Sequence, residues 1–287
     1  MGRCGNWSKR SGRSSRNRGY SVNATPALRW GFLIVAGVVA AVQPASAKIL
    51  STKSTASSNW SPLLALTLGG GFEFETDSQE SQYDFPFLIE YNFSERLKLT
   101  IEPNVSYIQA KSKDARTVTG FGDLETSVEY EFLRERRYRP ALSAEALIKW
   151  PTATDPDIGN PGTDYAFGII ASKDLVFVDL DMNVIYTFVG DRHEQNTLEI
   201  SLAGEMPLNN HLTIEAEVVT SFGTGGIHGQ PGTIGGLGGG SSSGTEGTVG
   251  LAWRVNKFMK LEGGLVLRSD QTWQVVTAWE WSFAGED

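Results

Sequence analysis

Short and long gaps alternate between the strand-like stretches of this chain, and this alternation constrains its fold more than any other feature. Twelve stretches in which apolar and polar residues alternate follow one another over residues 60–283. The short gaps lie near residues 94–95, 134–137, 173–174, 209–210 and 256–257. The others lie at residues 77–82, 110–120, 151–163, 189–197, 223–247 and 269–271, and all but the last are long. Closed outer-membrane barrels have an even number of antiparallel strands, tight periplasmic turns and longer extracellular loops. We therefore expect an all-β fold, an up-and-down antiparallel transmembrane β-barrel of twelve strands with both termini periplasmic.

The first 47 residues have the composition of a secretory signal peptide. They hold seven Lys and Arg residues and no Asp or Glu, and an apolar run over residues 30–42 precedes Ala45-Ser46-Ala47, an A-x-A cleavage signature. Thirteen apolar residues are too few for a membrane-spanning helix. We expect residues 1–47 to be removed, residues 48–59 to form a short periplasmic segment, residues 60–283 to form the barrel and residues 284–287 to be a C-terminal tail.

The composition of the remaining chain excludes several classes of protein. The only cysteine, Cys4, lies in the expected signal peptide, which argues against a disulfide framework or a cysteine metal site. Without the seven basic residues of that segment, 18 basic residues remain against 33 acidic ones, a net charge of −15. So acidic a chain is a poor nucleic-acid binder. No later apolar run reaches 18 residues, so we expect no transmembrane helix. The expected partners are outer-membrane lipid, the barrel-assembly machinery and a small-molecule solute, with no cofactor and no metal.

Each predicted strand has one apolar face and one polar face. Over residues 123–132, Leu124, Val128 and Phe132 share one face, whereas the other carries carboxylates. A soluble β-sandwich would bury the apolar face, but a membrane barrel turns it toward lipid. The signal peptide, the loop asymmetry and the placement of the later tryptophans at or near strand ends favour the membrane barrel.

Carboxylates dominate the face that a barrel would turn toward its lumen. We predict a lumen-lining, selectivity-determining set that consists of Glu125, Glu129, Glu131, Asp179, Asp181, Glu215 and Glu217. The basic residues on this face are few: Lys98, Lys149, Arg254, Lys260 and Arg268. Rings of Asp and Glu favour cations over anions. The alternative is a plugged lumen whose charges only satisfy one another.

Catalytic and metal-binding interpretations have less support. The histidines His193, His211 and His228 fall in predicted loops and turns, none on a rigid strand beside a serine, so we expect no catalytic residue and no enzyme. The aspartates of the 151–163 region lack the ligand order of a calcium loop, and turn chemistry explains them equally well. The Gly-rich segment 223–247 fits either a mobile extracellular loop or a loop that folds into the lumen.

Two short motifs resemble a known family. Gly120-Phe121-Gly122-Asp123 opens an alternating strand, and Lys149-Trp150-Pro151-Thr152 is followed by Thr163-Asp164-Tyr165. Both resemble hallmarks of the outer-membrane proteins named for the MetA pathway of phenol degradation, which are transporter-like β-barrels. The resemblance singles out Gly120, Gly122, Asp123, Pro151 and Asp164 as motif residues.

The resemblance implies passage of small molecules, including aromatic or hydrophobic compounds, and no catalytic residues. The chain departs from the usual barrel assembly signal because four residues follow the aromatic Phe283. We therefore expect an outer-membrane channel or transporter for small solutes with an acidic lumen. The second interpretation is a non-conducting structural or adhesive barrel that presents its extracellular loops.

Overall fold

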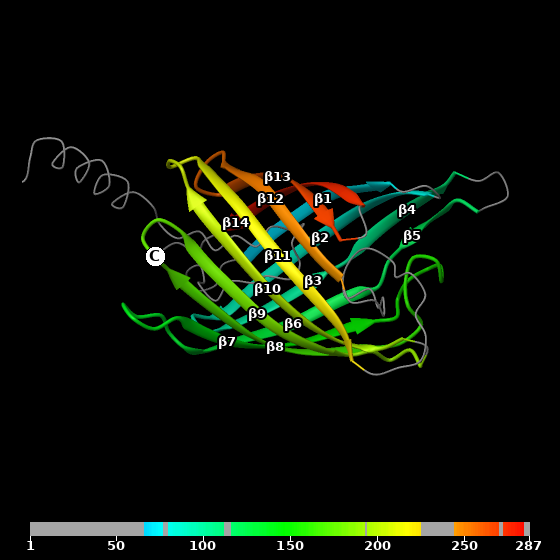
Figure 1. Cartoon of the computed structure of the whole chain (residues 1–287), viewed down its shortest axis with the longest axis horizontal. Helices are drawn as coiled ribbons and strands as arrows, with labels where there is room; N and C mark the ends of the chain where they lie inside the picture. The colour runs from blue at the N-terminus through cyan, green and yellow to red at the C-terminus, as the bar shows by residue number, and fades with distance from the viewer. Residues whose placement is uncertain are drawn as a thin grey trace, which may run out of the picture. The chain divides into compact units, whose positions relative to one another are not determined.

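The described part of the chain forms one closed antiparallel sheet. The computed structural model describes residues 66–76, 80–111, 116–192, 194–224, 244–269 and 272–283. The sheet closes because β1 pairs with both β2 and β14, and Figure 1 shows its strands crossing obliquely around the barrel. Its strands are β1 (Leu66–Thr76), β2 (Glu80–Ser94), β3 (Leu97–Glu102), β4 (Asn104–Ala110), β5 (Val118–Phe121), β6 (Leu124–Leu133), β7 (Ala141–Trp150), β8 (Asp164–Asp174), β9 (Asp179–Phe188), β10 (Asn196–Pro207), β11 (Leu212–Thr224), β12 (Gly244–Arg254), β13 (Met259–Arg268) and β14 (Trp273–Phe283).

Fourteen strand segments make twelve spans, because two spans are each interrupted once. Both β3 and β4 pair with β2, and they are separated only by Pro103, which has no N–H for the ladder. The neighbouring span breaks at Gly122 and Asp123, so that β5 pairs with β4 and β6 pairs with β3. Across these breaks the N–H of Phe87 still donates to Pro103 O and that of Gly122 to Asn104 O, both at 2.9 Å. The all-β class and the twelve-stranded closed antiparallel barrel predicted from the sequence are confirmed.

The connections differ in length at the two ends of the barrel in most places, as the sequence predicted. Two lengths were wrong: the gap predicted to be long at residues 77–82 covers only 77–79, and the turn predicted at 134–137 covers 134–140. One end has the short turns 95–96, 134–140, 175–178, 208–211 and 255–258. At the other end, loops 151–163 and 189–195 join β7 to β8 and β9 to β10, and the ends of β1 and β2, β4 and β5, β11 and β12, and β13 and β14 also meet there. We refer to these as the short-turn end and the long-loop end. The expected signal peptide, the segment 48–59 and the tail 284–287 lie outside the described residues, as does most of the Gly-rich segment 223–247.

One predicted turn position was wrong. The sequence placed a turn at residues 173–174, but β8 continues to Asp174 and the turn covers residues 175–178. The Asp174 carboxylate accepts a hydrogen bond from Val176 N at 2.6 Å, and Val176 adopts a positive φ of 74°. An aspartate at the start of a turn commonly bonds its own backbone two residues on. This local bond ends the strand, although the apolar run after Asp174 resembles a strand.

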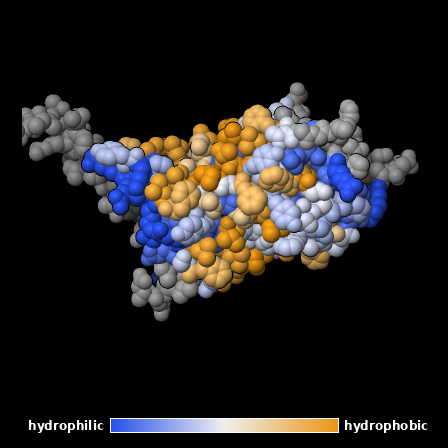
Figure 2. Space-filling model, turned by 90° about the horizontal axis from the view of Figure 1, so that it is seen from below, coloured by the Kyte–Doolittle hydropathy of each residue, from blue (hydrophilic) through white to orange (hydrophobic). Residues whose placement is uncertain are grey.

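Apolar side chains face outward and polar ones inward. On β2 and β6, Phe87 is 43% exposed whereas Glu129 is only 1% exposed. Figure 2 shows hydrophobic residues gathered across the middle of the visible face, with hydrophilic residues toward both ends. Exposed tryptophans, among them Trp150, Trp253 and Trp281, lie near strand ends, where a bilayer interface would meet them. This arrangement inverts that of a soluble β-protein and matches a barrel surrounded by lipid.

Within the residues that the structure describes, no helix is long and apolar enough to cross a membrane.

Candidate functional site

The interior of the barrel, which we call the lumen, carries the carboxylates that the sequence analysis singled out. Six of the seven are buried on the inner face and come from three strands: Glu125, Glu129 and Glu131 on β6, Asp181 on β9, and Glu215 and Glu217 on β11. The seventh, Asp179, is half-buried at the first position of β9. The alternation along each strand thus places them together, since successive side chains of a strand point to opposite faces.

Several of these carboxylates lie directly opposite another carboxylate on the neighbouring strand. Glu102 is paired in register with Glu125, Glu129 with Glu145, and Glu205 with Glu215. Like charges at such positions repel each other. The register thus brings the Cβ atoms of these carboxylates to within about 4.5–5.5 Å of each other. On their other sides, Glu125 lies opposite Lys149 and Glu129 opposite Lys98.

Near the short-turn end, two lysines are each shared between carboxylates. Lys98 Nζ on β3 lies 2.9 Å from Glu129 Oε2 and 3.4 Å from Glu90 Oε1. On β13, Lys260 forms an ion pair with Glu262 and lies 3.6 Å from Glu280 Oε2. One cation between two carboxylates leaves a local excess of negative charge.

Glu215 is the clearest example of a buried carboxylate on the inner wall. Its side chain is 2% exposed, and neither of its carboxylate oxygens has a hydrogen-bond partner among the described residues. It lies opposite Glu205 in the β10–β11 register. A buried carboxylate in this position is stabilised by a nearby cation or a proton.

A second charged group lies toward the long-loop end. Arg268 at the end of β13 forms an ion pair with Glu75, lies 3.0 Å from Glu246 Oε2 through Nε, and donates through Nη2 to Gln274 Oε1 at 3.0 Å. Gln274 in turn donates to Glu73 Oε2 at 2.8 Å. This network joins β1, β12, β13 and β14 beside the seam that closes the barrel.

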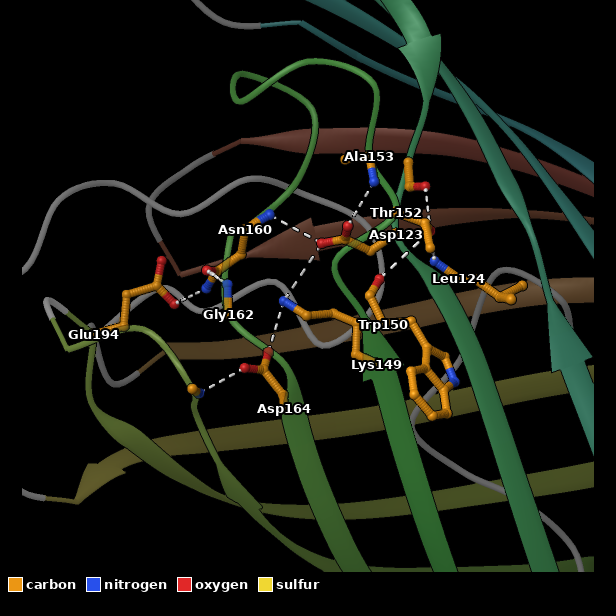
Figure 3. A network of polar contacts seen from close by, with 12 residues as sticks. Asp123, Leu124, Lys149, Trp150, Thr152, Ala153, Asn160, Gly162, Asp164 and Glu194 are labelled. Atoms are coloured by element: carbon orange, nitrogen blue, oxygen red, sulfur yellow. Dashed lines mark hydrogen bonds and ion pairs between the residues drawn. The ribbon is translucent and has the colours of Figure 1, made fainter.

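The motif residues come together around a lysine at the long-loop end. Lys149 Nζ, at the end of β7, lies 2.6 Å from Asp164 Oδ2 and 3.7 Å from Asp123 Oδ2, and all three side chains are buried (Figure 3). The Asp123 carboxylate accepts hydrogen bonds from the backbone N–H of Ala153 at 3.0 Å and of Asn160 at 2.9 Å. We call Asp123, Lys149 and Asp164 the charge hub. It links both sequence motifs and fixes the loop between them.

Loop 151–163 runs from this hub onto the inner face of β4 and β5 at the long-loop end. Its Ile158 is buried in a cluster with Ile108 and Val118, and Ile108 lies on the inner face of β4. Thr154 N donates to Phe121 O at 2.9 Å, which ties the loop to the end of β5. The composition suggested an inward fold as one alternative for the Gly-rich segment only, and it gave no sign that loop 151–163 packs on the inner face.

Two glycines, the motif residue Gly120 and Gly159 of the loop itself, are required by the close approach of this loop. A Cβ on Gly120 would lie 2.0 Å from Thr154 Oγ1. A Cβ on Gly159, within the loop, would lie 2.3 Å from Ala153 Cβ and 2.8 Å from both oxygens of Asp123. Gly122 is different, because a Cβ there would meet Asn104 at 3.5 Å, an ordinary contact. Pro151 is exposed where the loop begins, and nothing in the structure explains its identity.

The next loop, 189–195, contacts the same region. Asn160 Nδ2 donates to Glu194 Oε2 at 2.9 Å, and Gly190 N donates to Asp164 Oδ1 at 2.8 Å. Burial raises the pKa of Glu194, although nearby Lys149 and the hydrogen bond from Asn160 act in the opposite direction. Two carboxylates of the wall, Asp123 and Asp164, and one of loop 189–195, Glu194, thus interact with the same lysine.

The remaining aspartates and histidines have local roles where the structure describes them. Asp155 accepts a hydrogen bond from Asp157 N at 3.1 Å and forms an ion pair with Arg116. In the described part of the chain, no group of three or more His, Cys, Asp or Glu side chains is placed to hold a metal ion. His211 is exposed in a turn at the short-turn end, with Nδ1 2.9 Å from Arg254 O. His193 and His228 lie outside the described residues.

Comparisons with known proteins match the architecture alone. No family model and no curated protein matches the chain. An outer membrane channel from Pseudomonas putida F1 is similar in structure, with a TM-score of 0.61 and 11% identity over 78% of this chain and 97% of that one. The NanC porin has a TM-score of 0.54 and 11% identity over 75% and 98% of the two chains. A KdgM porin in complex with disordered oligogalacturonate has a TM-score of 0.51 and 11% identity over 75% and 99%. The chain therefore has the fold of outer-membrane channels and porins.

Proposed function

We propose that this protein is an outer-membrane channel that lets small solutes pass through an acidic lumen and favours cations. The observation that carries the proposal is the pairing of carboxylates with carboxylates across the inner wall, clearest at Glu205, which lies opposite Glu215 on β11 and Asp179 on β9. A wall whose only role was structural would gain stability from opposite charges at these positions. The outer-membrane fold of the similar channels and porins supports the proposal.

The electrostatic energies are large enough to select ions. Two unit charges 4 Å apart interact by about 1 kcal/mol in water and by about 4 kcal/mol at an effective dielectric constant of 20. A narrow wet lumen lies between these limits, so several surplus carboxylates outweigh the thermal energy. Cations are then enriched and anions depleted, and salt weakens the preference because it screens the wall.

The solute class follows from the same charge and from the motif resemblance. The KdgM porin was solved with an oligogalacturonate, a sugar acid polymer that an acidic lumen would repel. The two motifs resemble those of a family linked to aromatic compounds. We therefore infer that cationic or neutral small molecules pass, and that aromatic or hydrophobic ones are among them.

A structural or adhesive barrel is the second candidate. It is favoured by the tight packing of the lumen, where Glu129, Asp164 and Glu215 are almost fully buried and where each lysine is held by carboxylates. In that case the loops at the long-loop end would be the functional surface and nothing would cross the barrel.

Efflux from preloaded liposomes tests the proposed function. Purified protein should release neutral erythritol, and it should release the cation choline faster than the anion lactate. Replacing Glu125 and Glu129 by Gln and Asp181 by Asn should reduce the ratio of choline to lactate efflux, because these side chains line the inner face. The control variant Glu95→Gln, in an exposed turn, should leave the ratio unchanged.

The possible negative results of the efflux experiment distinguish the two candidate functions. Faster efflux of lactate than of choline would contradict the acidic lumen. No efflux of any solute from liposomes that contain folded protein would favour the structural barrel. Benzyltrimethylammonium, an aromatic cation, should leave at least as fast as choline if aromatic solutes belong to the natural class.

A further inference from the structure

The charge hub joins three parts of the molecule that are separate in the sequence. Asp123 follows β5, Lys149 is the penultimate residue of β7, and Asp164 is the first residue of β8. In the strand register Lys149 lies opposite Glu125 on one side and Asp164 on the other. The hub is therefore built on the rigid wall, although its hydrogen bonds reach into the loops.

Each carboxylate of the hub holds a different loop. Asp123 accepts the N–H groups of Ala153 and Asn160, both in loop 151–163. Asp164 is 0% exposed and accepts the N–H of Gly190 in loop 189–195. Lys149 lies between the two carboxylates, and its charge allows them to be buried side by side (Figure 3).

Loops 151–163 and 189–195 are also in close contact, and two glycines lie at the junction. A Cβ on Gly162 would lie 2.5 Å from Asp191 N, and a Cβ on Gly190 would lie 2.3 Å from Thr163 O. Asn160 spans the same junction through its hydrogen bond to Glu194. Loop 151–163 is thus held by the barrel wall, against which Ile158 packs, and by the neighbouring loop 189–195.

We propose that loop 151–163 sets the size limit for solutes that enter the barrel and that Lys149 is the residue that positions it. The inference rests on the proposed channel function. Lys149 is a positioning residue, because its ammonium group is buried among carboxylates and is not available to a passing solute. Without it, Asp123 and Asp164 repel each other, the loop leaves the wall, and the entrance widens.

The position of the loop can be tested without any transport. Val118 lies beneath Ile158 and is 4% exposed, so a cysteine there should react slowly with an impermeant maleimide. The chain has one natural cysteine, Cys4, which a serine should replace in all variants. Lys149→Met in the Val118→Cys protein should speed labelling by about tenfold, equivalent to about 1.4 kcal/mol. Unchanged labelling in the folded variant would overturn the positioning role of Lys149.

A disulfide provides the matched rescue for the size limit. A Cβ on Gly120 would lie 3.4 Å from Thr154 Cβ, close to the separation of about 3.8 Å found in disulfides. The size limit is measured as the largest polyethylene glycol that enters the channel and lowers its conductance. Lys149→Met should admit larger polymers. Adding Gly120→Cys and Thr154→Cys should restore the original limit when oxidised and lose it again when reduced.

A milder variant covers the case in which Lys149→Met does not fold. Asn160→Ala removes the hydrogen bond to Glu194 and the one that Asn160 Oδ1 accepts from Gly162 N, but it keeps the ion pairs of the hub. It should therefore shift labelling and polymer size in the same direction by less. Conducting variants with an unchanged polymer limit would overturn the inference and leave the channel function intact. If neither the wild-type protein nor the variants conduct, the channel function and the size limit are both overturned. Faster labelling in such variants would then support only the positioning role of Lys149.

Discussion

At the scale of single residues, one buried lysine decides where a loop lies. Lys149 sits between Asp123 and Asp164, and the hydrogen bonds of these carboxylates to backbone N–H groups carry its influence into two loops. Breaking a buried ion pair by removing one partner costs about 3–5 kcal/mol, because the other charge stays buried. The same residues elsewhere on the surface would contribute little.

Glycine at position 159 should be required for the loop, whereas glycine at position 122 should not. Gly159→Ala places a methyl group 2.3 Å from Ala153 Cβ and against the Asp123 carboxylate, so overpacking should destabilise the barrel by about 1–3 kcal/mol. Gly122→Ala meets Asn104 at 3.5 Å and should cost less than about 1 kcal/mol. Urea unfolding of the two variants in detergent measures the difference in the free energy of unfolding. Equal midpoints would show that the loop accommodates the methyl group without a loss of stability.

The motif residues were predictable from the sequence, but their purpose was not. Asp123 and Asp164 stand out as the polar ends of alternating strands, and Lys149 is one of few basic residues on the inner face. Their convergence depends on the register of β6, β7 and β8, which alternation does not determine. Glycines suggest conformational freedom, whereas here Gly120 in β5 and Gly159 in the loop permit close contact between the two segments.

At the scale of elements, period-two alternation was the reliable signal. It assigned the inner face of β6 and β11 correctly residue by residue, because a strand that separates lipid from a polar interior needs strict alternation. It failed at residues 175–178, where the apolar run continues but Asp174 starts a turn through a hydrogen bond to its own backbone. Pairing of like charges across strands was also invisible, since a shift of register changes every partner.

The two faces of β12 should respond differently to the same charge. Val249 lies midway along the strand and is 63% exposed on the outer face, whereas Thr248 is buried opposite Glu217. Val249→Arg should cost about 2–4 kcal/mol in folding into a bilayer, the value for arginine near the membrane midplane. Thr248→Arg should cost less, because Glu217 offers a partner. Unfolding titrations in phospholipid vesicles compare the variants, with Val249→Leu as the control, and equal costs would reject the assigned faces.

At the scale of the whole molecule, the number of spans was predictable and the loop asymmetry was predictable in most places, but the position of loop 151–163 was not. Counting stretches and gaps gave twelve spans, and the pairing of β1 with β14 closes them as an even antiparallel barrel requires. The position of loop 151–163 depends on contacts of Ile158 with β4 and β5, which are distant in sequence. Local composition cannot reveal such contacts.

The charge of the lumen is the central claim at this scale, and the reversal potential of the protein in a planar bilayer tests it most directly. Under a potassium chloride gradient the carboxylates of the inner wall should make the reversal potential approach that of potassium, and raising the total salt should weaken this bias. Replacing Glu125, Glu129 and Asp181 by their amides should move it toward zero, while Glu95→Gln should not. A reversal potential on the chloride side would contradict the account.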